Sequence, residues 1–453
     1  MDFSPLHGAP FLSPATMLYT QDNRFIPPPG GRPAVLSREQ YETLEADRLA
    51  PYAMKSASSR GRRHPEAEHP VRSAYQRDRD RIIHCAAFRR LEYKTQVFVN
   101  HEGDYYRTRL THTLEVTQIT RTIARTLRLN EDLAETIALA HDLGHTPFGH
   151  SGETIMNDLM ADHGGFEHNR QSLRVIEELE TRYPDFPGLN LTYEVREGIA
   201  KHNSEYDQSQ AEGYDPTTLS TLEARIVDVA DEIAYNNHDI DDGLTSDMID
   251  PEALEAVTLW REHFARIRQR WPSQPFSLWK HQTVRHIINA QVTDLVSTVH
   301  QRLGDAQIDS VEQARDPRHA DLVSFSADMS KKNRELKDFL MAHLYQHSRV
   351  IRMEAKARRI LTDLFTAYTE NPRQLPPSSY AAIAEAWEEN QRLDKELPDD
   401  LAGEARATAL RANPIHRENE GRIKRAICDY IAGMTDRFAI DEHKKLFDPH
   451  ERV

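Results

Sequence analysis

The sequence predicts an all-α fold, and three observations support this prediction. Apolar residues recur at helical spacing through long segments such as 108–129 and 219–238. Residues that start or break helices stand between such segments, as Asn130 and the pair Gly164 and Gly165 do. No segment of any length alternates apolar and polar residues as a half-buried strand does, and no internal repeat is evident.

The composition is that of a soluble protein with a substantial core. A chain of 453 residues can form one large domain or two or three ordinary ones. Its net charge is −15, and no apolar run approaches the roughly 20 residues that a membrane span needs. The stretch 1–31 lacks the basic start and apolar run of a signal peptide. Two cysteines exclude a disulfide framework and a cysteine-based zinc site, so we expect a cytoplasmic protein without membrane contact.

We expect three regions along the chain. Residues 1–65 are rich in Pro, Gly and Ser, which favours a poorly ordered N-terminal arm. One helix is expected in this arm from Ser37 to Arg48, because Ser37 followed by Glu39 and Gln40 is a capping-type start. Residues 66–250 are expected to form the core that carries the functional residues. Residues 251–453 are expected to form a helical C-terminal region that completes the fold and makes oligomer contacts.

The helices of the core and C-terminal regions are expected in the following order. An apolar pattern covers 75–99, and the pattern over 108–129 is stronger because its apolar residues keep helical spacing throughout. The next helix starts at Asn130, has two acidic residues in its first turn, and runs to His141 and Asp142. Further helices are expected over 166–176, up to 201–203, and over 219–238, 260–267, 284–303 and 336–368, and a last one ends near 434 after a proline-rich break at 372–377.

The charge is unevenly distributed. Between Arg60 and Arg109 there are 12 Lys and Arg against 7 Asp and Glu, a local excess of positive charge in an acidic chain. An enzyme for phosphorylated substrates needs such a segment, and so does a contact with nucleic acid. Alternatively, the arginines and aspartates of the run 77–81 form a solvated helix face on which they pair with each other. The sequence leaves both interpretations open.

The stretch 141–153 concentrates side chains that bind metals and carry protons, and it contains Gly and Pro where a helix must stop. Neutral imidazole and carboxylate are the ligands that suit Zn, Mn, Fe or Ni. His141 and Asp142 can both reach one ion from the last turn of a helix that ends at Gly144. The residues that follow within reach of such an ion are His145, His150 and Glu153.

Metal-capable residues from three expected helices complete this pattern: His112, His141, Asp142 and Asp231. Any one histidine of the 23 in the chain is by itself more typical of a structural or surface residue. Their order along the chain, at the start, end and middle of three helices, favours a metal site in a helix bundle. Two imidazoles and two carboxylates would leave positions for water or substrate. Asp231, Tyr235 and Asp239 are spaced by four residues and therefore project from one helix face.

In these four residues the chain resembles the HD-domain phosphohydrolases, and more narrowly the bacterial dGTPase-like deoxynucleoside-triphosphate triphosphohydrolases. The resemblance covers about residues 66–447. The matching motifs lie at 88–91, 94–98, 107–116, 141–153, 165–169, 201–203, 230–235 and 429–436.

The resemblance implies hydrolysis of a dNTP, dGTP or another, to a deoxynucleoside and inorganic triphosphate. A divalent metal ion (Mn, Mg, Fe, Ni or Zn) would be held by His112, His141, Asp142 and Asp231. His150 would protonate the departing 5′ oxygen as a general acid, and Glu153 would hold its ring. Arg109, His145 and His168 would contact phosphate, with Lys201 as a weaker candidate. Gln96, Tyr235 and Asp239 match positions that contact deoxyribose, where Tyr235 would exclude a ribose hydroxyl.

One position departs from the wider family. Animal relatives carry a lysine directly after the closing aspartate, and Glu232 stands there in this chain. Triphosphate binding would therefore use other cations. The resemblance further suggests a homo-oligomer of four or six subunits, a dNTP activator at a second site, and single-stranded DNA as a candidate partner.

Two other functions remain as alternatives. An HD-type phosphodiesterase for another substrate would share the metal ligands, but two-metal members carry a His-His pair before the closing aspartate, and none occurs here. A single-stranded nucleic-acid-binding protein would use the basic segment 60–109, and its binding would depend steeply on salt.

Overall fold

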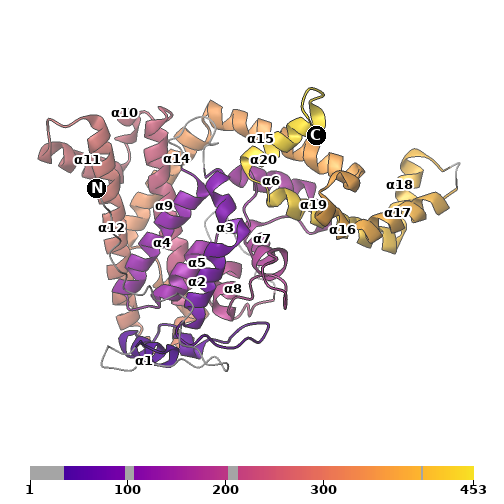
Figure 1. Ribbon diagram of the computed structural model, residues 1–453. Coiled ribbons are helices and arrows are strands. Elements are labelled where there is room, and N and C mark those ends of the chain that lie inside the picture. Colours follow the sequence, from indigo (N-terminus) through magenta and orange to yellow (C-terminus); the bar gives the residue numbers. More distant parts are fainter. Residues whose placement is uncertain (1–34, 97–106, 203–212, 399–400, 453) are drawn as a thin grey trace, which may run out of the picture.

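The computed structural model describes residues 35–96, 107–202, 213–398 and 401–452 (Figure 1). Over these residues the fold is all-α, as predicted, with isolated bridges and no β-strand. None of the described helices is both long and apolar enough to cross a lipid bilayer. Residues 1–34 of the expected arm, and the motif residues Val97, Phe98 and Asn203, lie outside the described part of the chain.

A first apolar core is centred on α5 (Glu131–Ala140), which is buried on nearly all sides, as expected of a central helix. The helices that pack on it are α2 (Ala74–His84), α4 (Arg109–Thr126), α8 (Tyr193–Ala200) and α9 (Leu222–Thr245). Shorter helices flank this group: α3 (Ala86–Arg90) and α7 (His168–Arg174). The same core continues into α10 (Pro251–Leu254), α11 (Thr258–Arg270), α12 (Phe276–Asp305), α13 (Val311–Ala314) and α14 (Ala327–Leu340).

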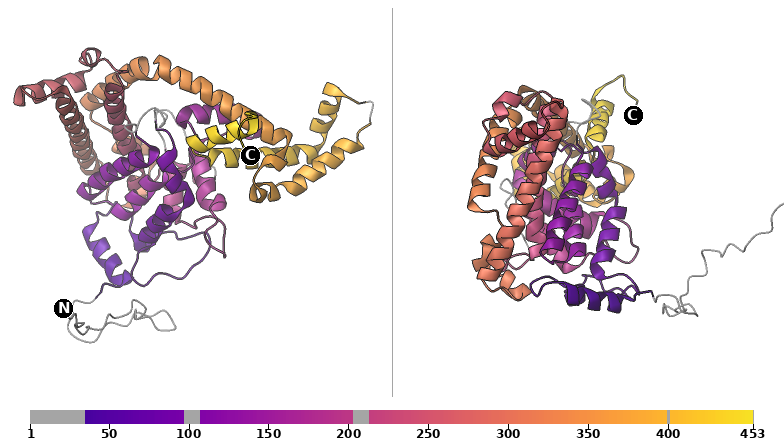
Figure 2. Two further views of the ribbon diagram at one scale, coloured as in Figure 1. Left: turned by 45° about the horizontal axis from the view of Figure 1, so that its top comes forward. Right: turned by 90° about the vertical axis from the view of Figure 1, so that its left-hand side faces the viewer.

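A second apolar core lies beside the first (Figure 2). It joins α6 (Gly149–Leu159) to helices from the end of the chain. These are α15 (Ser348–Glu370), α16 (Pro377–Ala381), α17 (Ala384–Glu396), α19 (Pro414–Ala432) and α20 (Asp436–Phe447). Helix α18 (Gly403–Ala412) has no buried residue and extends from the body together with α17 (Figure 1). Helices α10 to α14, which follow residue 250, therefore pack in the first core, and the second core combines α6 with helices that begin at Ser348.

Residues 35–65 are a folded part of the first core, which differs from the poorly ordered arm that we expected. The expected helix is present as α1 (Arg38–Arg48), and Ser37 and Gln40 form its capping box. Beyond it, Leu49 and Ala53 are buried against the core. The prediction from the proline and glycine content was wrong for residues 35–65, because hydrogen bonds to buried polar groups, rather than a long apolar run, hold this segment in place.

Most arginines of the basic segment are paired with acidic residues in the fold. The pairs include Arg62 with Asp78, Arg72 with Asp80, Arg77 and Arg81 with Glu66, Arg79 with Asp132 and Glu135, Arg107 with Asp241 and Asp242, and Arg109 with Asp142. Within the run 77–81 only Arg79 and Asp80 pair with each other, at 3.9 Å, and the other charges of the run pair with described residues outside it. The local excess of positive charge in the sequence is therefore not a measure of exposed positive charge.

Glu223, in the first turn of α9, fixes residues 35–65 to the core. Its Oε1 accepts hydrogen bonds from the backbone N–H groups of Met54, at 2.9 Å, and Asn130, at 3.1 Å. Burial raises the pKa of Glu223 to about 7, against hydrogen bonds that favour the charged form. The folded chain thus binds this proton more tightly than the unfolded chain, in which the pKa is near 4.5. Its contribution to stability is largest at low pH and is lost as pH rises from about 4.5 to 7.

We predict that Glu223→Ala lowers the free energy of unfolding by about 3 kcal/mol, because two buried N–H groups lose their acceptor. Glu223→Gln keeps an oxygen for both donors and should cost less. Because glutamine does not titrate, this variant should gain stability relative to the wild type as pH rises from 5 to 7.5. Urea unfolding at several pH values would measure both effects. A pH-independent difference between Glu223→Gln and the wild type would contradict the assignment.

Candidate active site

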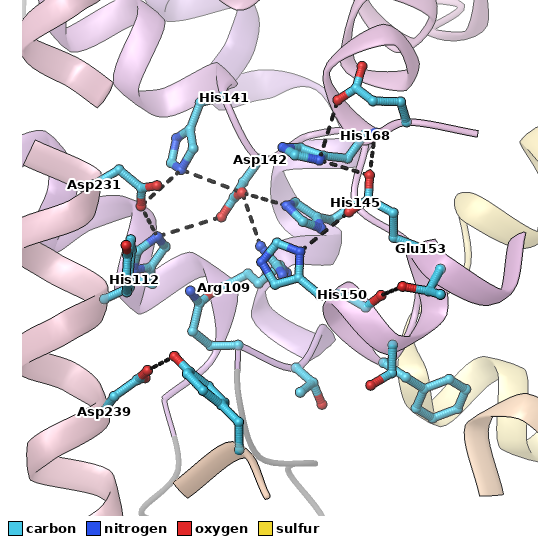
Figure 3. Close-up of a pocket in the computed structure, with 18 of the residues that line it drawn as sticks. Arg109, His112, His141, Asp142, His145, His150, Glu153, His168, Asp231 and Asp239 are labelled. Atoms are coloured by element: carbon cyan, nitrogen blue, oxygen red, sulfur yellow. Dashed lines mark hydrogen bonds and ion pairs between the residues drawn. The ribbon is translucent and has the colours of Figure 1, made fainter. Parts of the chain in front are cut away.

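A cavity of about 550 Å³ opens where the two cores meet. Its walls come from α4, the turn after α5, the first turns of α6 and α7, and the middle of α9 (Figure 3). Segments from beyond residue 340 close another side. Nearly all the residues that the sequence singled out line this cavity: Gln96, Arg109, His112, His141, Asp142, His145, His150, Glu153, His168, Asp231, Tyr235 and Asp239.

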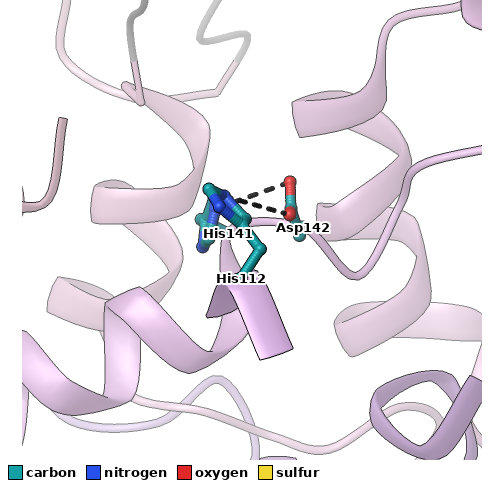
Figure 4. Close-up of side chains that lie close together, drawn as sticks. All are labelled: His112, His141 and Asp142. Carbon is teal, nitrogen blue, oxygen red and sulfur yellow. Dashed lines mark ion pairs between the residues drawn. The ribbon is translucent and has the colours of Figure 1, made fainter. Parts of the chain in front are cut away.

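The four expected metal ligands converge at one end of the cavity. Helix α4 carries His112, the C-terminal end of α5 carries His141 and Asp142, and α9 carries Asp231. The Nε2 atom of His112 lies 2.9 Å from Asp231 Oδ1 and 3.8 Å from Asp142 Oδ2. The Nε2 atom of His141 lies 3.5 Å from Asp142 Oδ1 and 3.8 Å from Asp231 Oδ1. Figure 4 shows how His112, His141 and Asp142 face one another.

The hydrogen bond behind His141 leaves its Nε2 lone pair free for a metal ion, whereas His112 Nε2 contacts Asp231 and the His112 ring is oriented by His238. His141 Nδ1 donates to the carbonyl oxygen of Ala138 at 2.7 Å, so Nε2 is the unprotonated atom. His238 donates from Nε2 to the Glu115 carboxylate and accepts at Nδ1 from His112 Nδ1, at 3.3 Å. Burial lowers the pKa of His238 to about 4, which keeps this imidazole neutral. Such outer hydrogen bonds orient metal-binding histidines.

The carboxylates fit a cation as well. Burial alone would raise the pKa of Asp231, but the hydrogen bond and charge of His112 hold it well below the usual range. The charges of His141 and Arg109 likewise hold the pKa of Asp142 well below its usual range, although its burial acts to raise that pKa. Its Oδ2 atom and the Nε2 atom of His141 are buried and have no hydrogen-bond partner among the described residues. A buried nitrogen and a buried carboxylate oxygen without hydrogen-bond partners are atoms that a divalent cation could bind.

Arg109 presents a guanidinium to the same space. Its Nη1 lies 3.0 Å from Asp142 Oδ1. Its Nε and Nη2 are buried and have no hydrogen-bond partner among the described residues. An unpaired buried N–H group costs free energy unless a ligand satisfies it, and a phosphate oxygen is the partner that an arginine fork fits best.

His145, His168, Glu153 and His150 form a connected group beside the metal ligands. His145 Nε2 lies 3.1 Å from Asp142 Oδ1, and its ring stacks on that of His168 at 4.1 Å between centroids. Glu153 accepts from the His168 ring at 3.0 Å and lies 3.4 Å from His150 Nδ1 through its other oxygen. Burial would raise the pKa of Glu153, but His168 and His150 hold it well below its usual range. The side chain of His150 is 59% exposed, so it stands at the cavity mouth.

Close packing and a strained residue shape the turn that carries this group. A Cβ atom on Gly144 would lie 2.2 Å from the backbone nitrogen of Ser172, so α7 can approach only a glycine there. Gly144 is thus required by close packing, and its φ is not positive. Phe148, just before α6, has φ 64° and ψ 23°, a left-handed conformation that costs on the order of 1–3 kcal/mol for a non-glycine residue.

The expected sugar-contacting residues line the same cavity, with Asp239 two turns of α9 beyond Asp231 (Figure 3). Gln96 and Tyr235 reach it from the segment before α4 and from α9. The Tyr345 hydroxyl donates to Asp239, and burial raises the pKa of Asp239 to about 7. Tyr345 ends a π-helical turn, Met341–Tyr345, more than 100 residues from Asp239. Sequence reasoning missed it because no local pattern marks such a contact.

With this geometry established, known proteins identify the family. A family model for the HD domain matches residues 109–236, and one for a phosphohydrolase-associated domain matches 323–403 and 395–445. A deoxyguanosinetriphosphate triphosphohydrolase-like protein of Geobacter sulfurreducens is 50% identical over 424 residues, which are 92% of this chain and 100% of that protein. This chain belongs to that family.

Other relatives agree in length and name. The protein of the same name from Azoarcus sp. is 48% identical over 89% of this chain and 97% of its own length. A solved structure of a hypothetical protein from Aquifex aeolicus covers 71% of this chain at 18% identity, with a TM-score of 0.28, which is too low to add to the assignment.

One expected phosphate contact, Lys201, lies outside the cavity, and Glu232 has a partner of its own. Lys201 is not among the described residues that line the cavity, because its Nζ donates to Glu197 at 3.0 Å and to the carbonyl oxygens of Asp215 and Thr218. Its neighbour His202 lines the cavity instead and contacts Asp228 at 2.5 Å. Glu232, where animal relatives carry a lysine, forms an ion pair with Lys337 at 3.0 Å.

We predict that His141→Ala weakens divalent-metal binding by at least about tenfold, because one of four converging ligands is lost. Metal content after equilibration with Mn²⁺ and desalting would measure this. His163→Ala, which removes a histidine outside the cavity, is the matched control and should bind metal as the wild type does. Unchanged metal content in His141→Ala would place the metal elsewhere.

Proposed function

We propose that this protein hydrolyses deoxynucleoside triphosphates to a deoxynucleoside and inorganic triphosphate. The observation that carries the proposal is the order of groups along one cavity. The candidate metal ligands lie beside the unpaired N–H groups of Arg109, and His150 is exposed at the mouth. Tyr235 and Asp239 follow Asp231 along α9 at intervals of four residues, so Asp239 lines the cavity two helical turns away from the metal ligands (Figure 3). The cavity can thus hold a phosphate at one end and a sugar at the other. The family of relatives named for dGTP hydrolysis agrees with this substrate class.

The reaction requires attack of water at the α-phosphorus and departure of the 5′ oxygen. A divalent ion held by His112, His141, Asp142 and Asp231 would supply Lewis acidity toward the phosphate and a water of lowered pKa. Arg109 would donate to a phosphate oxygen from Nε and Nη2. His145 and His168 line the same wall and would donate to other phosphate oxygens.

His150 would supply the proton that the departing oxygen needs. As the phosphorus–oxygen bond breaks, the 5′ oxygen takes a proton from the His150 ring, and the deoxynucleoside leaves as a neutral alcohol. Glu153, 3.4 Å from His150 Nδ1, would orient that ring and stabilise its protonated form. Because Glu153 also bonds His168, one carboxylate aligns both histidines.

Tyr235, Asp239 and Gln96 would select the deoxyribose. The Tyr235 ring would occupy the space that a 2′ hydroxyl needs, and Asp239 and Gln96 would hold the 3′ hydroxyl. Gln96 Oε1 is buried and has no hydrogen-bond partner among the described residues, so it can accept from such a hydroxyl. The identity of the metal, the dNTP activator, single-stranded DNA as a partner, the homo-oligomer and the cytoplasmic location remain predictions from the sequence.

Product analysis tests the reaction. Purified protein incubated with each dNTP and Mn²⁺ or Mg²⁺ should release a deoxynucleoside and triphosphate, which ion-exchange chromatography separates. GTP should react at least about tenfold more slowly than dGTP, because the Tyr235 ring would occupy the space of its 2′ hydroxyl. Release of pyrophosphate or single phosphates would refute the proposed reaction. If single dNTPs are inert, mixtures of dNTPs test the need for an activator.

We predict that His150→Ala lowers kcat by about 10² to 10⁴-fold, the usual range for loss of a general acid. Metal content should be unchanged, whereas Asp142→Ala should lose both metal and activity. His163→Ala serves again as the matched histidine control and should keep full activity. Steady-state kinetics with metal analysis separates these cases, and normal kcat in His150→Ala would remove the acid assignment.

A further inference from the structure

Asp436, the first residue of α20, reaches two segments of the candidate active site that lie 288 and 341 residues before it in the sequence. Its Oδ1 accepts from the backbone N–H of Phe148 at 2.9 Å. Its Oδ2 accepts from the backbone N–H of Thr95 at 2.9 Å and from the Thr95 hydroxyl. One buried carboxylate thus joins the residue before Gln96 to the turn that ends two residues before His150.

The Phe148 contact falls on the strained residue of this turn. A left-handed non-glycine residue persists only where its surroundings hold it. Helix α6 has no side-chain cap from Phe148, and the Phe148 N–H is turned to Asp436 instead. The Phe148 side chain packs in the second core, so helices from the end of the chain hold this residue through both its backbone and its ring.

A second buried contact holds the other end of the turn. Lys94, adjacent to Thr95, donates to the carbonyl oxygen of His145 and, at 2.9 Å, to that of Ala432 at the end of α19. The segment 145–148 is therefore fixed at both ends to the C-terminal helices. The residues that depend on it are the phosphate contact His145 and the acid His150.

We propose that Asp436 is a positioning residue for the catalytic step. Its carboxylate holds the turn before α6 and the segment of Gln96 in one arrangement, and thereby sets the place of His150 relative to the metal ligands. This role rests on the proposed function for its effect on turnover. The contact between Asp436 and the turn does not depend on the proposed function, so it can be tested whatever reaction the protein catalyses.

The test compares Asp436→Asn with two controls on the full-length protein. In Asp436→Asn the amide nitrogen replaces one acceptor, so the N–H of Phe148 or of Thr95 loses its partner. Tyr368→Phe removes a different, partly buried hydrogen bond to α20, the one from the Tyr368 hydroxyl to Glu442, and leaves the turn intact. Asp441→Asn changes a half-exposed aspartate of the same helix.

We expect Asp436→Asn to lower kcat by about 10 to 100-fold, because misplacement of a catalytic group by about 1 Å has effects of this size. KM should change less than about threefold and metal content not at all, since the metal ligands belong to the first core. Amide hydrogen exchange over 145–152 should become faster. Tyr368→Phe should lower the melting temperature yet keep kcat, and Asp441→Asn should resemble the wild type.

Three outcomes would overturn the proposal. They are unchanged exchange over 145–152 in Asp436→Asn, faster exchange with normal kcat, and an equal loss of kcat in Tyr368→Phe at matched loss of stability. A wild-type protein that cleaves no dNTP, alone or in mixtures, would instead refute the proposed function. In that case hydrogen exchange still decides whether Asp436 holds the turn.

Discussion

The active site depends on a buried carboxylate that several positive or polar groups share. Asp142 Oδ1 lies 3.0 Å from Arg109, 3.1 Å from His145 and 3.5 Å from His141. Burying a carboxylate costs several kcal/mol unless it is paired, so each of these partners must be held in place by the fold. The partners come from α4 and from both sides of the turn after α5. Packing of α5 against α4 and α9 therefore decides whether the metal ligands meet.

The sequence predicted what local rules control. Helical spacing and capping residues located α1, α4, α5 and α9, and the four-residue spacing of Asp231, Tyr235 and Asp239 placed these residues in one cavity. Tyr345 and His238 were missed, and Asp436 was noted only as the end of the motif 429–436, because each acts through a partner brought near only by tertiary packing. Residues 35–65 were misjudged for the same reason, since Glu223 fixes them from a distance.

Lys201 shows the limit of carrying a motif over to a role. The motif itself is correctly placed, because His202 lines the cavity. The side chain of Lys201, one residue earlier, instead contacts Glu197 and two backbone carbonyl oxygens. Three acceptors satisfy an ammonium group, so this lysine stabilises the loop before α9. Most arginines of the basic segment resemble Lys201 in this respect, because they form ion pairs with acidic residues of the fold.

The two apolar cores divide the proposed catalytic groups between them. His141 and Asp142 follow a helix of the first core, whereas His150 belongs to α6, whose Ile155 and Met156 pack in the second. The distance between the proposed metal ligands and the proposed acid is thus a distance between two packed bodies, joined by the short turn 145–148. A turn alone would let that distance vary, because loops are the most mobile parts of a fold. The proposed reaction needs this distance to be fixed, and buried contacts hold the turn to both cores. The C-terminal helices are therefore part of the structure that positions the site.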